Sequence, residues 1–197
     1  MDTPLTRSRY ALVARLPRPV EVQIEDAFLT LVGITRPIMG FHITLVGPFT
    51  WIAESPPQGV LDRLARLCLR VQPIELQIGG QGAFVGIESN AVYLKVVRND
   101  PLCRLQAQAD HLLRPHIVLQ RDIISAEYVP HVTLGLGLTP DERDRALATL
   151  ADAGFSATVP VNELHLVEER PGSPWRPLLA LPLAGQPSPE PHRIHEE

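Results

Sequence analysis

One short pattern occurs twice in this chain, and it constrains the possible fold more than any other feature. Residues 42–45 read His-Ile-Thr-Leu and residues 131–134 read His-Val-Thr-Leu, in a chain with seven histidines in all. Both tetrads lie in apolar surroundings, which is typical of buried strands whose side chains alternate between two faces. The repeat therefore predicts two matched strands in a fold built around a sheet.

The alternation decides which side chains of each tetrad share a face. His42 and Thr44 point the same way, roughly 7 Å apart along the strand, and so do His131 and Thr133. The apolar residues between and after them face the opposite side and would anchor each strand to a layer of helices. Two such strands side by side leave room for one small tetrahedral anion, and a phosphate has this shape.

These residue types suit phosphoryl chemistry. An imidazole has an unperturbed pKa of about 6.5, so one ring can take a proton from water while a second ring gives a proton to the departing oxygen. Threonine hydroxyls can donate hydrogen bonds to the non-bridging oxygens and stabilise the developing charge. One histidine on a buried strand is more often a hydrogen-bonded core residue, but a matched pair favours catalysis, and such a pair needs no metal.

With their flanks, the motifs read FHITLVGPF at residues 41–49 and PHVTLGLG at residues 130–137. They resemble the paired H-x-[ST]-Φ motifs of the 2H phosphoesterases, in particular the LigT-like branch of 2′-5′ RNA ligases and RNA 2′,3′-cyclic phosphodiesterases. The resemblance implies that His42 and His131 are the catalytic acid and base and that Thr44 and Thr133 bind the phosphate. It implies an enzyme without cofactor or metal that opens a terminal 2′,3′-cyclic phosphate of RNA to a 2′-phosphate, with His42 protonating the leaving 3′ oxygen.

One residue departs from the family pattern. Many cyclic phosphodiesterases of this family have an arginine two residues after the second motif, where this chain has Leu136. Several readings therefore stay open beside the RNA cyclic phosphodiesterase and its possible 2′-5′ RNA ligase activity. The chain could be an RNA-terminus binding protein with little turnover, or a phosphodiesterase acting on small cyclic nucleotides or 2′-5′ oligonucleotides.

The balance of charged side chains limits the kind of nucleic acid that this chain could bind. With 18 basic and 22 acidic side chains the formal charge is −4, which argues against a broad surface that tracks the phosphates of a duplex. An RNA end needs only a few contacts. Cys68 and Cys103 both fall on predicted helices and are expected to be reduced. No apolar run approaches the roughly 20 residues of a membrane span, so we expect a cytoplasmic location without membrane contact. We also expect a monomer.

The apolar periodicity predicts an α+β fold. We expect a bilobal, duplicated unit with two antiparallel sheets flanked by helices, related by a pseudo-twofold axis around a central cleft. A single domain would cover residues 1–184, and residues 185–197 would form a flexible Pro-rich tail. The expected strands are 10–16, 41–46, 74–78, 83–87, 92–97, 129–136, 155–159, 161–167 and 175–183, and the expected helices are 22–32, 57–71, 100–114 and 140–153.

Overall fold

The structure is a computed structural model that describes residues 7–29, 31, 34, 36–37, 39–86, 90–120 and 127–185. Within these residues the chain forms four α-helices, one short 3₁₀ turn and nine strands, so the predicted α+β class is confirmed. The helices are α1 (Arg18–Phe28), α2 (Gln58–Leu69), α3 (Asp100–Leu113) and α4 (Pro140–Ala153). The strands are β1 (Arg9–Arg15), β2 (His42–Trp51), β3 (Ile74–Val85), β4 (Asn90–Val96), β5 (Ile117–Leu119), β6 (His131–Leu138), β7 (Ser156–Val161), β8 (Glu163–Glu169) and β9 (Arg176–Pro182).

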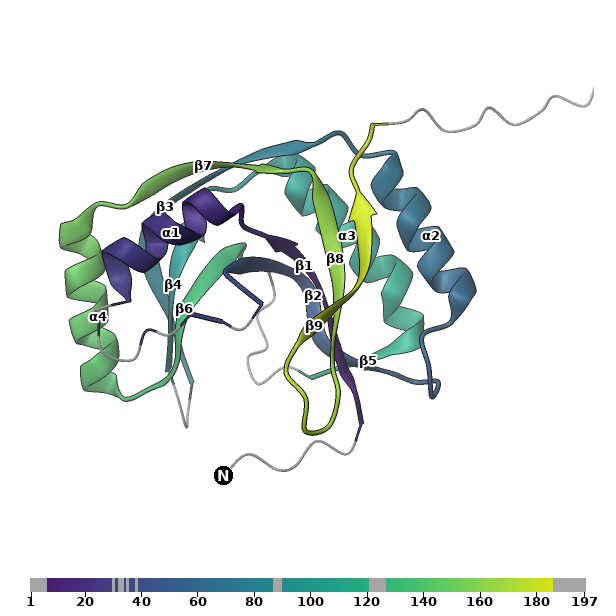
Figure 1. Cartoon of the computed structure of the whole chain (residues 1–197), viewed down its shortest axis with the longest axis horizontal. Coiled ribbons are helices and arrows are strands. Elements are labelled where there is room, and N and C mark those ends of the chain that lie inside the picture. The colour runs from purple at the N-terminus through teal and green to yellow at the C-terminus, as the bar shows by residue number, and fades with distance from the viewer. Residues whose placement is uncertain are drawn as a thin grey trace, which may run out of the picture.

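The strands belong to one curled antiparallel sheet, in the order β7-β3-β4-β6-β2-β1-β8-β9, with β5 paired to β2. The prediction of two sheets is therefore wrong. The two motif strands, β2 and β6, pair with each other through Ile43 and Val132. This pairing joins the half of the sheet formed by β7, β3, β4 and β6 to the half formed by β2, β1, β8 and β9. Figure 1 shows the resulting arch, with β2 and β6 adjacent near its middle.

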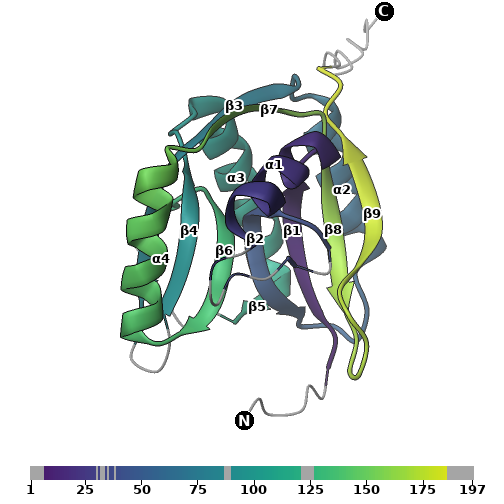
Figure 2. The same cartoon turned by 60° about the vertical axis from the view of Figure 1, so that its left-hand side comes forward.

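Helices cover the outside of the arch. In Figure 1, α2 and α3 lie outside the right arm and α4 lies outside the left arm. The α2 and α3 helices contact each other, α3 contacts β2, and α4 contacts β3, β4 and β6. Figure 2 shows α1 in front of the sheet, near the top of β2 and β1. At the end of α1 the Phe28 ring meets Phe155 edge to face at 5.5 Å.

Burial explains the orientation of the two motif strands. Ile43 and Val132 are 0% exposed, and Leu45 and Leu134 are each 1% exposed. Burying one such side chain contributes about 1.5 to 3 kcal/mol, so a strand turned over by one residue would lose this contribution at several positions. The apolar residues thus face the helices, as predicted, and the histidines and threonines point to the other face.

Several element boundaries differ from the sequence predictions. Helix α1 begins at Arg18 rather than at residue 22, because a proline in its first turn starts it and the buried face is formed by Val20, Ile24 and Phe28. Residues 74–85 form one strand rather than two, because Gly79 and Gly80 coincide with a register shift against β4 and make an irregularity instead of a break. The short strand β5 lies between the predicted helix 100–114 and the predicted strand 129–136, where the sequence predicted no element.

Both ends of α4 (Pro140–Ala153) agree with the predicted helix of residues 140–153. At its start Thr139 and Glu142 form a capping box, and at its end the helix is capped by Gly154, whose φ is 60°. Near the end of the described chain, the Gly185 amide donates to the Val71 carbonyl at 2.9 Å. Gly185 is thus attached to the fold, and the rest of the expected tail lies outside the described residues. Among the residues that are described, no helix is long and apolar enough to cross a membrane.

Candidate active site

The four predicted site residues come together where β2 meets β6. His42 is the first residue of β2 and His131 is the first residue of β6. The strands run antiparallel through the Ile43–Val132 pair. His42 is therefore the cross-strand neighbour of Thr133, and His131 is the cross-strand neighbour of Thr44. All four side chains are half-buried.

Both imidazoles are held in the same way. Nδ1 of His42 lies 3.0 Å from the carbonyl oxygen of Gly40, and Nδ1 of His131 lies 2.8 Å from that of Val129. A carbonyl oxygen can only accept, so Nδ1 of each ring must donate. Each ring therefore has its Nε2 free of this bond, where it can accept or release a proton.

Burial lowers the pKa of both histidines. For His42, the Arg15 guanidinium lowers the pKa further, whereas the hydrogen bond to Gly40 and the Glu21 carboxylate act in the opposite direction. For His131, the charge on His42 adds to burial and the hydrogen bond to Val129 opposes it. The two rings are therefore close enough to interact, and protonation of one disfavours protonation of the other.

Aromatic rings surround His131. Phe84 of β3 meets the imidazole edge-on with ring centroids 4.9 Å apart, and Tyr93 of β4 lies 5.1 Å from it. Phe84 and Tyr93 also contact each other, at 4.5 Å. A side chain at Gly82 would collide with the Tyr93 ring. This packing restricts the His131 ring and contributes to its burial.

Tyr128 connects the two motif segments. Its hydroxyl donates to the backbone carbonyl of Thr44 at 3.1 Å, across 84 residues of sequence. Burial raises the pKa of Tyr128 well above its usual value, so the hydroxyl keeps the proton that it donates. The approach to β6 is thereby tied to β2, a contact that the sequence did not predict.

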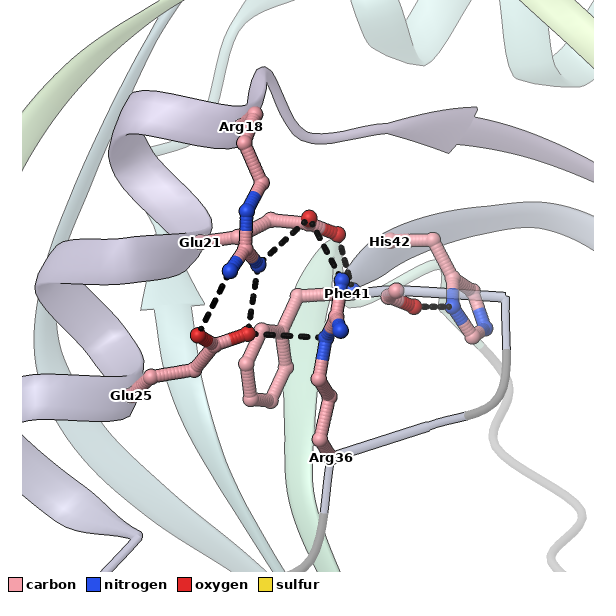
Figure 3. Close-up of polar contacts among 7 residues, drawn as sticks. Arg18, Glu21, Glu25, Arg36, Phe41 and His42 are labelled. Carbon is pink, nitrogen blue, oxygen red and sulfur yellow. Dashed lines mark hydrogen bonds and ion pairs between the residues drawn. The ribbon is translucent and has the colours of Figure 1, made fainter.

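The carboxylate of Glu21 bonds to the backbone just before His42. The backbone amide of Phe41 donates to Glu21 of α1 at 2.8 Å, and the side chain of Glu21 is 5% exposed. Arg18 and Arg36 form ion pairs with this carboxylate. Figure 3 shows these contacts beside the bond from His42 to the backbone. Nothing in the local pattern marked Glu21, apart from an acidic residue on the buried face of a helix.

Arg15 and His165 extend the face that carries His42. In the register of β1 and β2, Arg15 pairs with His42 and Val13 pairs with Thr44. Val13 also pairs with His165 on β8, so these side chains share one face of the sheet. Sequence reasoning missed Arg15, although the alternation within residues 10–16 would have turned it away from the core.

The remaining candidates lie elsewhere. Leu136 is 73% exposed. Cys68 is buried, which raises its pKa to about 12, so its thiol is not activated. His111 is exposed on α3, and His116 lies 3.5 Å from Arg63. Within the described ranges no group of three or more His, Cys, Asp or Glu side chains is arranged to hold a metal ion.

Comparison with known proteins places this geometry in a family. The sequence profile described as the 2′-5′ RNA ligase superfamily matches residues 39–172, more than half of the chain. Over 134 residues the chain is 25% identical to a protein of Bacillus anthracis and 26% identical to one of Bacillus cereus, both named as putative phosphoesterases. These matches cover 68% of this chain and 73% of each relative.

Solved structures share the fold. TT0787 of Thermus thermophilus superposes with a TM-score of 0.60 at 19% identity, covering 90% of this chain and 99% of that one. LigT of E. coli, complexed with NADP+, gives a TM-score of 0.59 at 19% identity, over 90% and 98% of the two chains. Usb1 of Kluyveromyces marxianus gives 0.53 at 15% identity, over 91% and 100%. Together with the profile match across both motifs, these likenesses show that the chain belongs to the 2′-5′ RNA ligase superfamily of 2H phosphoesterases.

Proposed function

We propose that this protein is a phosphoesterase that opens 2′,3′-cyclic phosphates at RNA ends to 2′-phosphates. One observation carries the proposal: two imidazoles, each with Nδ1 bonded to a backbone carbonyl, begin two paired strands that each carry a threonine on the same face. That arrangement supplies two proton-transfer groups and two hydroxyl donors around one small anion.

In the proposed mechanism, His131 in its neutral form takes a proton from a water molecule that attacks the phosphorus. The bond between phosphorus and the 3′ oxygen breaks, and Nε2 of protonated His42 gives its proton to that oxygen. The products are a 2′-phosphate and a 3′-hydroxyl. Thr44 and Thr133 donate to the non-bridging oxygens. No metal takes part in any step. If the 5′-hydroxyl of a second RNA replaced the attacking water, the same displacement of the 3′ oxygen would join the two RNAs through a 2′-5′ bond.

The names of related structures support a nucleotide ligand. E. coli LigT has been solved with ATP, with NADP+ and with 3′-AMP, and Usb1 with uridine monophosphate. We extend this chemistry to the present chain, with an RNA end as the substrate. We also propose that residues 1–184 act as one domain, whose halves are duplicated units related by a pseudo-twofold axis and facing a central cleft.

A second candidate, an RNA-terminus binding protein with little turnover, is favoured by Leu136. This exposed side chain stands where many relatives have an arginine, and a guanidinium stabilises a phosphate well. In the catalytic reading, Arg15 offers a guanidinium instead, from the position that pairs with His42. The candidates differ in whether product forms.

Incubation with an RNA that ends in a 2′,3′-cyclic phosphate, in the presence of EDTA, tests the proposal. We expect conversion to a 2′-phosphate at a rate that EDTA does not change. Bound but unconverted RNA would favour the binding role. Activity that EDTA abolishes and one added metal restores would contradict the metal-free mechanism.

The pH dependence gives an independent prediction. Since one imidazole must be charged and the other neutral, kcat/KM should follow a bell. Burial lowers the pKa of both rings, so the maximum for the free enzyme should lie on the acidic side of about pH 6.5. A bound phosphate stabilises the charged rings, so the maximum of kcat should lie at higher pH than that of kcat/KM. A rate that rises steadily into the alkaline range would contradict the paired mechanism.

A further inference from the structure

We infer that Glu21 is a positioning residue for His42, acting through the backbone of residues 40 and 41. The inference rests on the proposed function of His42 as a proton-transfer group. Glu21 lies on α1, in the segment before the first motif strand. Its carboxylate bonds to the Phe41 amide, and the His42 ring bonds to the Gly40 carbonyl. Its effect passes through a peptide unit whose two ends contact the carboxylate and the ring.

The contacts form a short chain. Oε1 of Glu21 accepts the hydrogen bond of the Phe41 amide at 2.8 Å. The same peptide unit ends in the Gly40 carbonyl, whose oxygen lies 3.0 Å from Nδ1 of His42. A peptide unit is planar, so the direction of the Phe41 N–H also fixes the direction of the Gly40 carbonyl. Figure 3 shows the carboxylate and the His42 ring at opposite ends of this unit.

Gly40 has a backbone conformation and a lack of side chain that this contact requires. Its φ is +81°, a conformation that favours glycine. A Cβ at this position would collide with Oε1 of Glu21. The backbone therefore approaches the carboxylate as closely as the absence of a side chain allows. Helix α1 and the start of β2 are fitted to each other at this point.

Two arginines hold the carboxylate in place. Arg36 lies 3.2 Å and Arg18 lies 3.4 Å from Oε2 of Glu21, which leaves Oε1 for the Phe41 amide. Both arginines also pair with Glu25, at 2.6 Å for Arg18 and 2.7 Å for Arg36. Because a buried carboxylate needs such partners, this network makes one orientation of Glu21 strongly preferred.

The two histidines differ in this respect. The Glu21 carboxylate raises the pKa of His42, while Arg15 from β1 lowers it. For His131, the charge that lowers the pKa is that of His42. Glu21 therefore favours the protonated form of His42, in addition to orienting its ring. Loss of this carboxylate should act directly on the titration of His42, and on that of His131 only through the charge on His42.

The experiment compares three variants in the full chain. Glu21→Ala removes the acceptor and the charge, and Glu21→Gln keeps an oxygen that can accept from Phe41 but removes the charge. Glu25→Gln is the matched control, because Glu25 pairs with both arginines, whereas the Phe41 amide donates to Glu21. Thermal melting shows which variants are folded.

We expect Glu21→Ala to lower kcat on the cyclic-phosphate RNA by about 10²-fold with little change in KM. Glu21→Gln should lose less and should move the titration of His42, followed by NMR of histidine labelled with ¹⁵N, to lower pH. Glu25→Gln should resemble the wild type in both measurements.

A folded Glu21→Ala variant with wild-type kcat and wild-type His42 titration would overturn the inference. Equal losses in the Glu21→Gln and Glu25→Gln variants would also overturn it, since they would indicate a general effect of the ion-pair network. The NMR titration does not depend on turnover. A wild-type protein that is inactive on this RNA would therefore refute the proposed function, while the response of His42 still decides the role of Glu21.

Discussion

Replacement of His42 or His131 by alanine is expected to lower kcat by about 10²- to 10⁴-fold. Each ring is held by a bond from Nδ1 to a backbone carbonyl, so its loss would remove a positioned group that the proposed mechanism uses for proton transfer. The double variant should be little worse than the more affected single variant, because in the proposed mechanism the two groups act in one concerted step. Release of the 2′-phosphate product from cyclic-phosphate RNA is the measurement.

The matched control for these variants is His111→Ala, which removes an exposed histidine of α3 and should keep wild-type turnover. Binding of the RNA, measured with a substrate analogue, should fall far less than kcat in the two active-site variants. If both variants hydrolyse the RNA within a few-fold of the wild type, the acid and base lie elsewhere and the central proposal is wrong.

Thr44→Val and Thr133→Val should each lower kcat by about 10²-fold. Valine matches threonine in shape and suits a strand, so the substitution removes the hydroxyl donor with little change in packing. The loss should fall mainly on kcat, since the bonds to the non-bridging oxygens strengthen as charge develops on them. Steady-state kinetics on the same RNA separates kcat from KM.

Thr50→Val provides the comparison, because Thr50 is half-buried on the same strand as Thr44 but at the opposite end of β2. It should behave like the wild type. Equal effects of Thr44→Val and Thr50→Val would mean that the strand responds to valine in the same way at any position, and that Thr44 has no special contact with the phosphate.

Local features of the chain were predictable from sequence because they depend on neighbouring residues. The alternation of His42, Ile43 and Thr44 predicted which side chains turn to the core, and burial of Ile43 agrees. The predicted start of α4 at residue 140 agrees with the structure, where a capping interaction joins Thr139 and Glu142, three residues apart. In each case the signal and the structure that it specifies lie within one element.

Other features depend on partners that are distant in sequence. The single sheet arises from the pairing of Ile43 with Val132, and no local pattern distinguishes it from two separate sheets. Glu21 has the appearance of an ordinary helical glutamate until the Phe41 amide is seen beside it. Arg15 faces the same side as His42 through the register of β1 and β2, which the order of residues alone does not give.

The registered pair between β2 and β6 brings the two histidines together from different halves of the sheet. His42 is carried by the half that contains β2 and β1, and His131 by the half that contains β6 and β4. At this seam the sheet continues through the pair of Ile43 and Val132, with the bond from Tyr128 to Thr44 as a second tie. The spacing of His42 and His131 is thus a property of the seam rather than of either half, and in the proposed mechanism each half by itself would hold only one of the two proton-transfer groups.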